Sequence, residues 1–210
     1  MTGPAPGNVD SMHLYNMLKN GQLGSMLNVT GVSAARKVQQ WAVDSSRLGI
    51  PLILGYDVIH GYRTMFPIPL AEAASWEPEM AKLSSQVAAA EASAAGLHWT
   101  FAPMVDISHD ARWGRVMEGA GEDPYLGSKM AYARVKGFQG DDLSAPYTIA
   151  ACAKHLAAYG FVESGCDYNT VIMSNERLHN IVLPPFKACI EADVATFMNA
   201  FNTINGLPAT

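Results

Sequence analysis

Short apolar segments alternate with longer segments of helical length along this 210-residue chain, and the alternation constrains the fold more than any other feature. The apolar segments have the length of strands and are continuously apolar, as is typical of parallel strands covered on both faces. We therefore predict an α/β fold with about five βα units. The predicted strands span residues 22–29, 51–58, 99–107, 148–156 and 195–202, and the predicted helices span residues 32–46, 77–95, 122–137 and 174–191.

Signals at the helix ends support this division. For the helix predicted over 77–95, Ser75 is placed to cap the N-terminus, Pro78 suits the first turn, and Gly96 suits a left-handed exit. Ser174 opens the last predicted helix in a similar way. Because a (β/α)8 barrel closes only with eight units, five units predict either an open doubly wound sheet or part of a barrel.

The overall composition narrows the range of partners. The chain has 14 Lys and Arg residues against 19 Asp and Glu residues, so its net charge of −5 has the wrong sign for a nucleic-acid-binding surface. The richest apolar run, residues 94–105, is interrupted by polar residues, glycine and proline, so we expect no membrane span. Residues 119–124 begin like a dinucleotide fingerprint, but Pro124 stands at its third glycine position. We therefore predict a soluble chain with no cofactor and with neither nucleic acid nor a membrane as partner.

The cysteines and the N-terminus indicate little specialised chemistry. Cys152, Cys166 and Cys189 are odd in number and lack CxxC spacing, so we interpret them as buried thiols rather than as a disulfide framework or a zinc site. Residues 1–8 lack the basic region and apolar core of a secretory signal peptide.

Polar residues cluster where the predicted strands end, which is where parallel α/β folds hold their ligands. They are Asp57 and His60 after the second strand, Asp106, Arg115 and Glu118 after the third, Lys154 and His155 in the fourth, and Met198, Asn199, Phe201 and Asn202 in the fifth. Carboxylates accept hydrogen bonds from vicinal hydroxyls, cations donate to the remaining oxygens, and Met or Phe can cover the apolar face of a sugar ring. Because several cations and carboxylates neutralise one another, the set predicts a neutral polyhydroxylated ligand.

Some of these residues also have structural interpretations. Asp57 is compatible with a loop or helix cap, and a structural role is favoured for His60. Glu118 is expected to orient Arg112 or Arg115. Glu122 and Asp123 are expected to open the following helix, where negative charge suits the helix dipole.

A metal-dependent hydrolase is the competing chemical interpretation. Its ligands would be Asp57, His60, Asp106 and His155, which are suitable residue types at strand ends. The sequence has no His-x-His pair, and nearby cations such as Lys154 would repel a metal ion. We therefore predict no metal site.

Eight motifs in order resemble the N-terminal barrel domain of glycoside hydrolase family 3, and the bacterial β-glucosidases most of all. The resemblance covers the chain from about residue 17 onward. The motifs are Tyr56-Asp-Val-Ile-His-Gly61, Phe66-Pro-Ile-Pro69, Trp99-Thr-Phe-Ala-Pro-Met-Val-Asp106, Arg112-Trp-Gly-Arg115, Gly121-Glu-Asp-Pro124, Ala153-Lys-His-Leu-Ala-Ala-Tyr-Gly160, Pro184-Pro-Phe186 and Asn202-Thr-Ile-Asn-Gly-Leu-Pro-Ala-Thr210.

The resemblance implies a partial (β/α)8 barrel with about five βα units. Residues 1–210 are then an incomplete N-terminal barrel domain, truncated at both ends, and a C-terminal α/β sandwich domain is absent. It also implies retaining hydrolysis that removes β-linked glucose from the non-reducing end of glycosides or oligosaccharides. Periplasmic or secreted proteins are common in the family, so either location is compatible with the resemblance.

The resemblance also implies roles for single residues. The substrate-binding residues are Asp57, Arg115, Lys154, His155, Met198 and Phe201. No catalytic residue is expected in this chain, because the family's nucleophile Asp and acid/base Glu correspond to positions beyond Thr210. We therefore expect the chain alone to be inactive and to depend on the remainder of its barrel for solubility.

Two further alternatives stay open within this interpretation. One is a non-catalytic carbohydrate-binding or fold-only fragment, and the other is a β-xylosidase or another exo-glycosidase of the same family. Asp57 in a Tyr-Asp-Val context resembles the glucosidases, whereas the xylosidases tend to carry Glu there. Ala157-Ala-Tyr-Gly160 replaces the Pro-Gly-His-Gly loop of the family's N-acetylglucosaminidases, which disfavours that branch.

Overall fold

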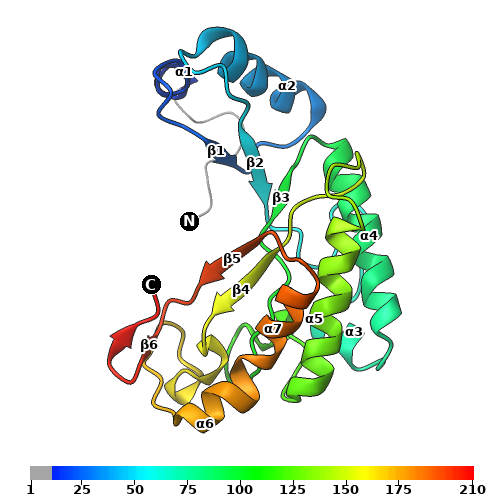
Figure 1. Ribbon diagram of the computed structural model, residues 1–210, viewed down its shortest axis with the longest axis vertical. Coiled ribbons are helices and arrows are strands. Elements are labelled where there is room, and N and C mark those ends of the chain that lie inside the picture. Colours follow the sequence, from blue (N-terminus) through cyan, green and yellow to red (C-terminus); the bar gives the residue numbers. More distant parts are fainter. Residues whose placement is uncertain (1–10) are drawn as a thin grey trace.

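Five parallel strands follow one another across the molecule in the computed structural model, which describes residues 11–210 (Figure 1). They are β1 (Ser25–Leu27), β2 (Ile53–Tyr56), β3 (Trp99–Thr100), β4 (Cys152–Leu156) and β5 (Thr196–Asn199). Each lies within one of the five predicted segments, so the predicted α/β fold with parallel strands is confirmed. The signal-peptide prediction concerns residues 1–8 and lies outside the described residues.

The strands form one continuous arc, in which spatial order equals sequence order. β1, β2 and β3 are paired in parallel, and so are β4 and β5, whose register shifts between Lys154 and Leu156. The segment after β3 joins these two groups, because Cys152 N donates to Ala102 O at 2.8 Å and Val105 N donates to Lys154 O at 2.8 Å. Among residues 11–210 the arc does not close on itself, so the structure is part of a barrel rather than a complete one.

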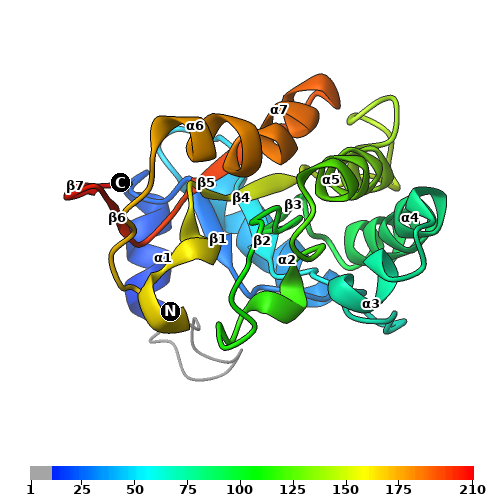
Figure 2. The ribbon, with the colours of Figure 1, turned by 90° about the horizontal axis from the view of Figure 1, so that it is seen from below.

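Seven α-helices and a hairpin accompany the strands in the described part of the chain. The helices are α1 (Ser11–Lys19), α2 (Val32–Gln40), α3 (Pro69–Ala73), α4 (Pro78–Ala94), α5 (Pro124–Gln139), α6 (Asn175–Arg177) and α7 (Pro184–Glu191), and the hairpin consists of β6 (Thr203–Ile204) and β7 (Leu207–Pro208). Figures 1 and 2 show α4, α5 and α7 on one side of β3, β4 and β5. The opposite side of these strands is the concave side of the arc.

Two predictions about helices need correction. The helix predicted over 174–191 is interrupted by a π-helical turn and restarts at Pro184, because consecutive prolines lack the N–H groups that a continuous helix needs. Ser75 does not cap α4: Glu77 occupies that position, while the Ser75 hydroxyl donates to Glu72 O at the end of α3. The exit at Gly96 is as predicted, with φ of 90°.

The pair α4 and α5 packs closely on the outer side of the sheet. A Cβ atom at Gly137 of α5 would lie 2.5 Å from Lys82 O and 2.5 Å from Ser85 Cβ of α4. Small residues on α4, including Ala81 and Ala88, are buried along the same helix. The two helices can therefore cover the sheet without leaving space between them.

The outer strands of the arc differ from the prediction that all strands are covered on both faces. Leu27 of β1 is 53% exposed, Ile53 of β2 is 52% exposed, and Phe197 of β5 is 39% exposed. By contrast, the β4 residues Cys152, Ala153 and Lys154 are buried. The prediction fails for β1 and β5, which lie at the two ends of the arc. Phe197 lies on the side of β5 that faces α7, with its ring centroid 6.4 Å from that of Phe186, and is only partly covered there.

The cysteines follow the prediction in two of three cases. Cys152 and Cys189 are buried, and burial raises the pKa of the Cys189 thiol to about 12. Cys166 is exposed, so its interpretation as a buried thiol is wrong; it lies in a loop rather than in an apolar strand or helix. None of the helices between residues 11 and 210 combines the length and the hydropathy that a bilayer crossing requires.

Candidate functional site

The charged residues selected from the sequence meet at the carboxyl ends of the central strands. Asp57 directly follows β2, and Lys154 and His155 belong to β4. Arg115 directly precedes the 3₁₀ turn Val116–Glu118, and Glu118 is the last residue of that turn, which lies in the loop between β3 and α5. The parallel arrangement of the strands explains this convergence, because it brings all carboxyl ends to the same edge.

Lys154 is the centre of this cluster and is almost completely buried. Its side chain is 4% exposed, and Nζ lies 3.5 Å from Asp57 Oδ1 and 3.7 Å from Glu118 Oε2. Two carboxylates on different segments therefore compensate one buried cation. The Asp57 side chain remains 61% exposed, which leaves it open to a ligand as well as to Lys154.

Arg115 and Glu118 form a bidentate ion pair beside Lys154. Arg115 Nε donates to Glu118 Oε1 at 2.6 Å, and Nη2 donates to Oε2 at 2.9 Å. Burial alone would raise the pKa of Glu118, but the hydrogen bonds from Arg115 and the charge of Lys154 outweigh it and hold that pKa below its ordinary value. Burial alone would lower the pKa of Arg115, but the hydrogen bonds to Glu118 and the charge of that carboxylate outweigh burial and raise the pKa of Arg115. Both side chains are therefore charged at neutral pH.

His155 connects this ion pair to a further buried carboxylate, that of Asp106. Its Nδ1 lies 2.8 Å from Asp106 Oδ2, and the same oxygen accepts from the His155 backbone N–H at 3.0 Å. The other ring nitrogen, Nε2, lies 3.1 Å from Arg115 Nη1. Sequence reasoning placed Asp106 among the polar residues at the strand ends and among the ligands of the metal alternative, but it did not predict the contact with His155.

Met198 and Phe201 lie on the next segment of the arc. Met198 is the register partner of Lys154 in the β4–β5 pair. The Phe201 ring is half exposed, with its centroid 5.7 Å from that of His155 and 5.5 Å from that of the buried Tyr159. All six residues predicted to bind substrate are therefore brought together around the end of β4.

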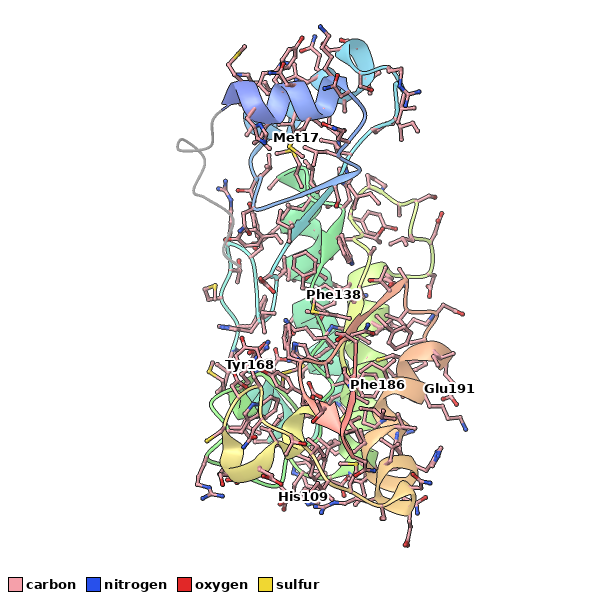
Figure 3. All side chains as sticks on the ribbon, turned by 90° about the vertical axis from the view of Figure 1, so that its left-hand side faces the viewer. Met17, His109, Phe138, Tyr168, Phe186 and Glu191 are labelled. Carbon is pink, nitrogen blue, oxygen red and sulfur yellow. The ribbon has the colours of Figure 1, made fainter. Side chains whose placement is uncertain are left out.

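An aromatic group, missed by sequence reasoning, extends the site. Tyr168 is 66% exposed, and its ring centroid lies 5.4 Å from that of Phe201. Neighbouring Asp167 accepts a hydrogen bond of 2.8 Å from the indole N–H of Trp113, which anchors this loop to the β3–α5 loop. Figure 3 shows Tyr168 and Phe186 of α7 on opposite sides of the lower part of the molecule. Tyr168 follows no strand directly, so no strand-end signal pointed to it.

The remaining polar residues have local roles. The ring of His60 is hydrogen-bonded through Nδ1 to Phe66 O at 2.9 Å, in keeping with its predicted structural role. Arg112 pairs with Asp110 and not with Glu118, so of the two predicted partners Glu118 orients Arg115. Asp123 accepts from Leu126 N at 2.7 Å and caps α5 as predicted.

The site offers hydrogen-bonding groups but no metal-binding cluster. Within the described range, no group of three or more His, Cys, Asp or Glu residues is arranged to hold a metal ion. The carboxylates of the cluster are each engaged by a cation or by His155, and the pKa of Glu118 lies below its ordinary value. The geometry suits recognition of neutral hydroxyl groups better than proton donation to a leaving group.

Comparison with known sequences gives a consistent result. Residues 7–210 match the profile described as "Glycosyl hydrolase family 3 N terminal domain". The chain is 46% identical over 197 residues to a periplasmic beta-glucosidase of Salmonella typhimurium, a match that covers 94% of this chain and 26% of the relative. It is 36% identical over 185 residues to a beta-xylosidase of Formosa agariphila, covering 82% of this chain and 26% of the relative.

Solved structures agree with the sequence matches. A β-glucosidase from Listeria innocua in complex with glucose is similar with a TM-score of 0.86 and 46% identity, over 89% of this chain and 26% of that one. The same enzyme in complex with isofagomine is similar with a TM-score of 0.88 and 43% identity, over all of this chain and 29% of that one. The chain thus spans about a quarter of the length of these relatives.

Proposed function

The chain belongs to glycosyl hydrolase family 3 and carries its N-terminal, TIM-barrel-like domain, and from this premise we propose that it forms the glucose-binding pocket of a β-glucosidase. The proposed reaction is hydrolysis of O-glycosidic bonds, with removal of β-linked glucose from the non-reducing end of a glycoside or oligosaccharide. The single observation that carries this proposal is the cluster of Asp57, Lys154, Glu118, Arg115 and His155 at the carboxyl ends of the strands.

Each residue of the pocket has a proposed task. Asp57 accepts hydrogen bonds from two neighbouring sugar hydroxyls, since its carboxylate is exposed while Lys154 holds it in place. Lys154 and Arg115 bind the other oxygens, and Met198 and Phe201 line the pocket. His155, whose two ring nitrogens face Asp106 and Arg115, supports the pocket from behind Arg115. Of the five N–H groups of a guanidinium, Arg115 uses two for Glu118 and one for His155, so two remain for the sugar.

The reactive carboxylates belong, in this proposal, to positions outside residues 1–210. A retaining glycosidase needs a nucleophile and an acid/base at roughly 5 Å separation, and the acid must hold a proton near neutral pH. Glu118 does not meet that need, because Arg115 and Lys154 keep its pKa below the ordinary value. We therefore propose that residues 1–210 are part of an incomplete N-terminal barrel domain and that a C-terminal α/β sandwich domain completes the enzyme.

Glucose is the proposed sugar, and a periplasmic or secreted location is proposed with it. The chain is 46% identical to a periplasmic beta-glucosidase and 36% identical to a beta-xylosidase, which supports glucose over xylose. The Tyr-Asp-Val context of Asp57 supports the same choice. The name of the Salmonella relative supports the location.

Binding of glucose to the 210-residue chain tests the pocket directly. Titration with glucose, followed by ¹H–¹⁵N NMR, is expected to shift amide signals around β4, and xylose is expected to bind more weakly. The Lys154→Met variant is expected to lose at least tenfold in affinity for glucose, because the substitution removes the buried cation that two carboxylates contact. The matched control is Lys187→Met, whose lysine is exposed on α7.

The outcomes separate the remaining interpretations. Equal loss in both lysine variants, or none in Lys154→Met, would contradict the pocket. Tighter binding of xylose than of glucose would favour a β-xylosidase, and absence of any sugar binding would favour a fold-only fragment. An aryl β-glucoside is expected to show no turnover above buffer with the 210-residue chain; enzyme-like rates would refute the assignment of the reactive carboxylates to other positions.

A further inference from the structure

We propose that Asp106 is a positioning residue: its buried carboxylate fixes His155 as the tautomer protonated on Nδ1, so that Nε2 accepts a hydrogen bond from Arg115 and aims its guanidinium. The tautomer itself does not depend on the proposed function. Its consequence for sugar binding does rest on that function, since Arg115 belongs to the proposed pocket.

The direction of the hydrogen bonds follows from the chemistry of Arg115. A guanidinium group only donates, so Nε2 of His155, 3.1 Å from Arg115 Nη1, must offer its lone pair. The ring proton then lies on Nδ1, which is 2.8 Å from Asp106 Oδ2, an acceptor. Both ends of the ring therefore require the same tautomer. A doubly protonated ring would place an N–H against the N–H of Arg115.

Asp106 is held so that it can impose this choice. Its side chain is 1% exposed, as is that of His155. The oxygen that faces the ring also accepts from the backbone N–H of His155 at 3.0 Å. The carboxylate and the imidazole are thereby fixed to each other at two points, and the position of the ring cannot change independently of Asp106.

These contacts fix the orientation of the planar guanidinium group of Arg115. Glu118 takes two N–H groups of Arg115 on one side, and His155 takes one from Nη1 on the other. Arg115 is thus held from two directions. If the proton of His155 moved to Nε2, an N–H would face Nη1, and the guanidinium would have to turn away from its present direction.

The test compares two aspartates of the same loop. Asp106→Leu roughly keeps the size of the side chain but removes the oxygen that accepts from both Nδ1 and the backbone N–H of His155, so the tautomer protonated on Nδ1 loses its acceptor. Asp106→Asn is the conservative variant, because its carbonyl oxygen can accept both bonds. The matched control is Asp110→Asn, whose aspartate pairs with the exposed Arg112 and does not contact His155. The measurements are the ring ¹⁵N shifts of assigned His155 in labelled protein at neutral pH, and the affinity for glucose.

The expected wild-type spectrum has a protonated Nδ1 and an unprotonated Nε2 for His155. Asp106→Leu is expected to move the proton to Nε2, wholly or in part, and to weaken glucose binding at least tenfold, whereas Asp110→Asn changes neither. Asp106→Asn is expected to retain the tautomer and to bind glucose more tightly than Asp106→Leu. Protonated Nε2 in the wild type, an unchanged tautomer in Asp106→Leu, or a changed tautomer with unchanged affinity would each overturn the proposal.

The proposal and the proposed function fail in distinguishable ways. If the wild type binds no glucose, the function fails, while the ring shifts still decide whether Asp106 fixes the tautomer. If Asp106→Leu does not fold, the wild-type shifts alone decide, because the opposite tautomer there is incompatible with the contacts of Asp106 and Arg115.

Discussion

Glu118 is the residue whose ionisation connects the two cations of the cluster. It contacts Arg115 through both oxygens and lies 3.7 Å from Lys154 Nζ. Because the folded state holds its pKa below the ordinary value of 4.5, the folded state binds fewer protons than the unfolded state in acid. Its contribution to stability is therefore present above that value and is lost as the pH falls through the lowered pKa.

The lowered pKa of Glu118 leads to a prediction about how stability depends on pH. The free energy of unfolding of the wild type is expected to decrease as the pH falls below 4.5 and through the lowered pKa of Glu118, and Glu118→Gln is expected to remove that part of the decrease. Denaturant titrations of both proteins at several pH values measure the difference. Parallel pH profiles for the two proteins would show that Glu118 is not the group responsible.

Sequence reasoning identified the charged residues of the site because each stands near the end of an apolar segment or in the loop that follows one. Lys154 within an apolar run was the strongest signal, since an uncompensated lysine is rarely buried. The partners were less accessible: the choice between Arg112 and Arg115 for Glu118, and the contact of Asp106 with His155, depend on the path of the β3–α5 loop. A loop path is set by tertiary contacts that periodicity does not encode. The sugar-binding roles stay predictions.

Among the elements, α5 shows how a single cap fixes where a helix begins. Asp123 accepts from Leu126 N, whereas the neighbouring Glu122 makes no such bond through its side chain. We expect Asp123→Ala to lower the free energy of unfolding by about 0.5–2 kcal/mol. Glu122→Ala serves as the control, with a smaller effect, in the same thermal or urea unfolding measurement. A larger loss in Glu122→Ala would contradict the assignment of the cap.

The contact between α4 and α5 gives a second prediction at this scale. Gly137→Ala improves helix propensity by about 1 kcal/mol, but the new Cβ meets the backbone of Lys82, which cannot move aside easily. We expect net destabilisation of about 1–3 kcal/mol. A Cβ atom at Gly127 of the same helix would lie 2.7 Å from the tip of the Ile107 side chain and in ordinary contact with Pro185, but against no backbone atom, so the cost of Gly127→Ala is expected to be smaller. Urea unfolding of both variants checks the order.

The elements themselves were predictable to different degrees. All five strands lie inside the predicted segments but are shorter, and in the third segment the ladder is interrupted where Pro103 lacks an N–H group. The short α3 and the hairpin of β6 and β7 were not predicted, since segments of two to five residues carry too little periodicity. The pair Pro184-Pro185 marks the break before α7 in the sequence, because neither residue has the N–H group that a continuous helix needs.

For the whole molecule, the open arc leaves apolar surface uncovered at both ends. Leu27 of β1 and Phe197 of β5 are exposed, and an apolar groove of about 640 Å³ lies beside β5 and α7. Edge strands with exposed backbone groups and apolar side chains favour association between chains.

We therefore predict that the 210-residue chain self-associates as its concentration approaches the millimolar range. Light scattering is expected to show a reduction for the double variant Leu27→Lys with Phe197→Lys, because charges at both edges oppose strand pairing. The control is Ile172→Lys, which changes an exposed apolar residue in a loop. A monomeric wild type with a sharp cooperative melt would contradict the prediction.

The match between strand order in space and strand order in sequence bears on synthesis. As the polypeptide leaves the ribosome from its N-terminus, β1 and β2 are complete before β3 emerges, and each later strand meets an edge that already exists. No strand has to be inserted between two that are already paired. Translation can therefore extend the sheet in one direction only, and the pocket around Lys154 begins to assemble once β4 has joined the growing edge.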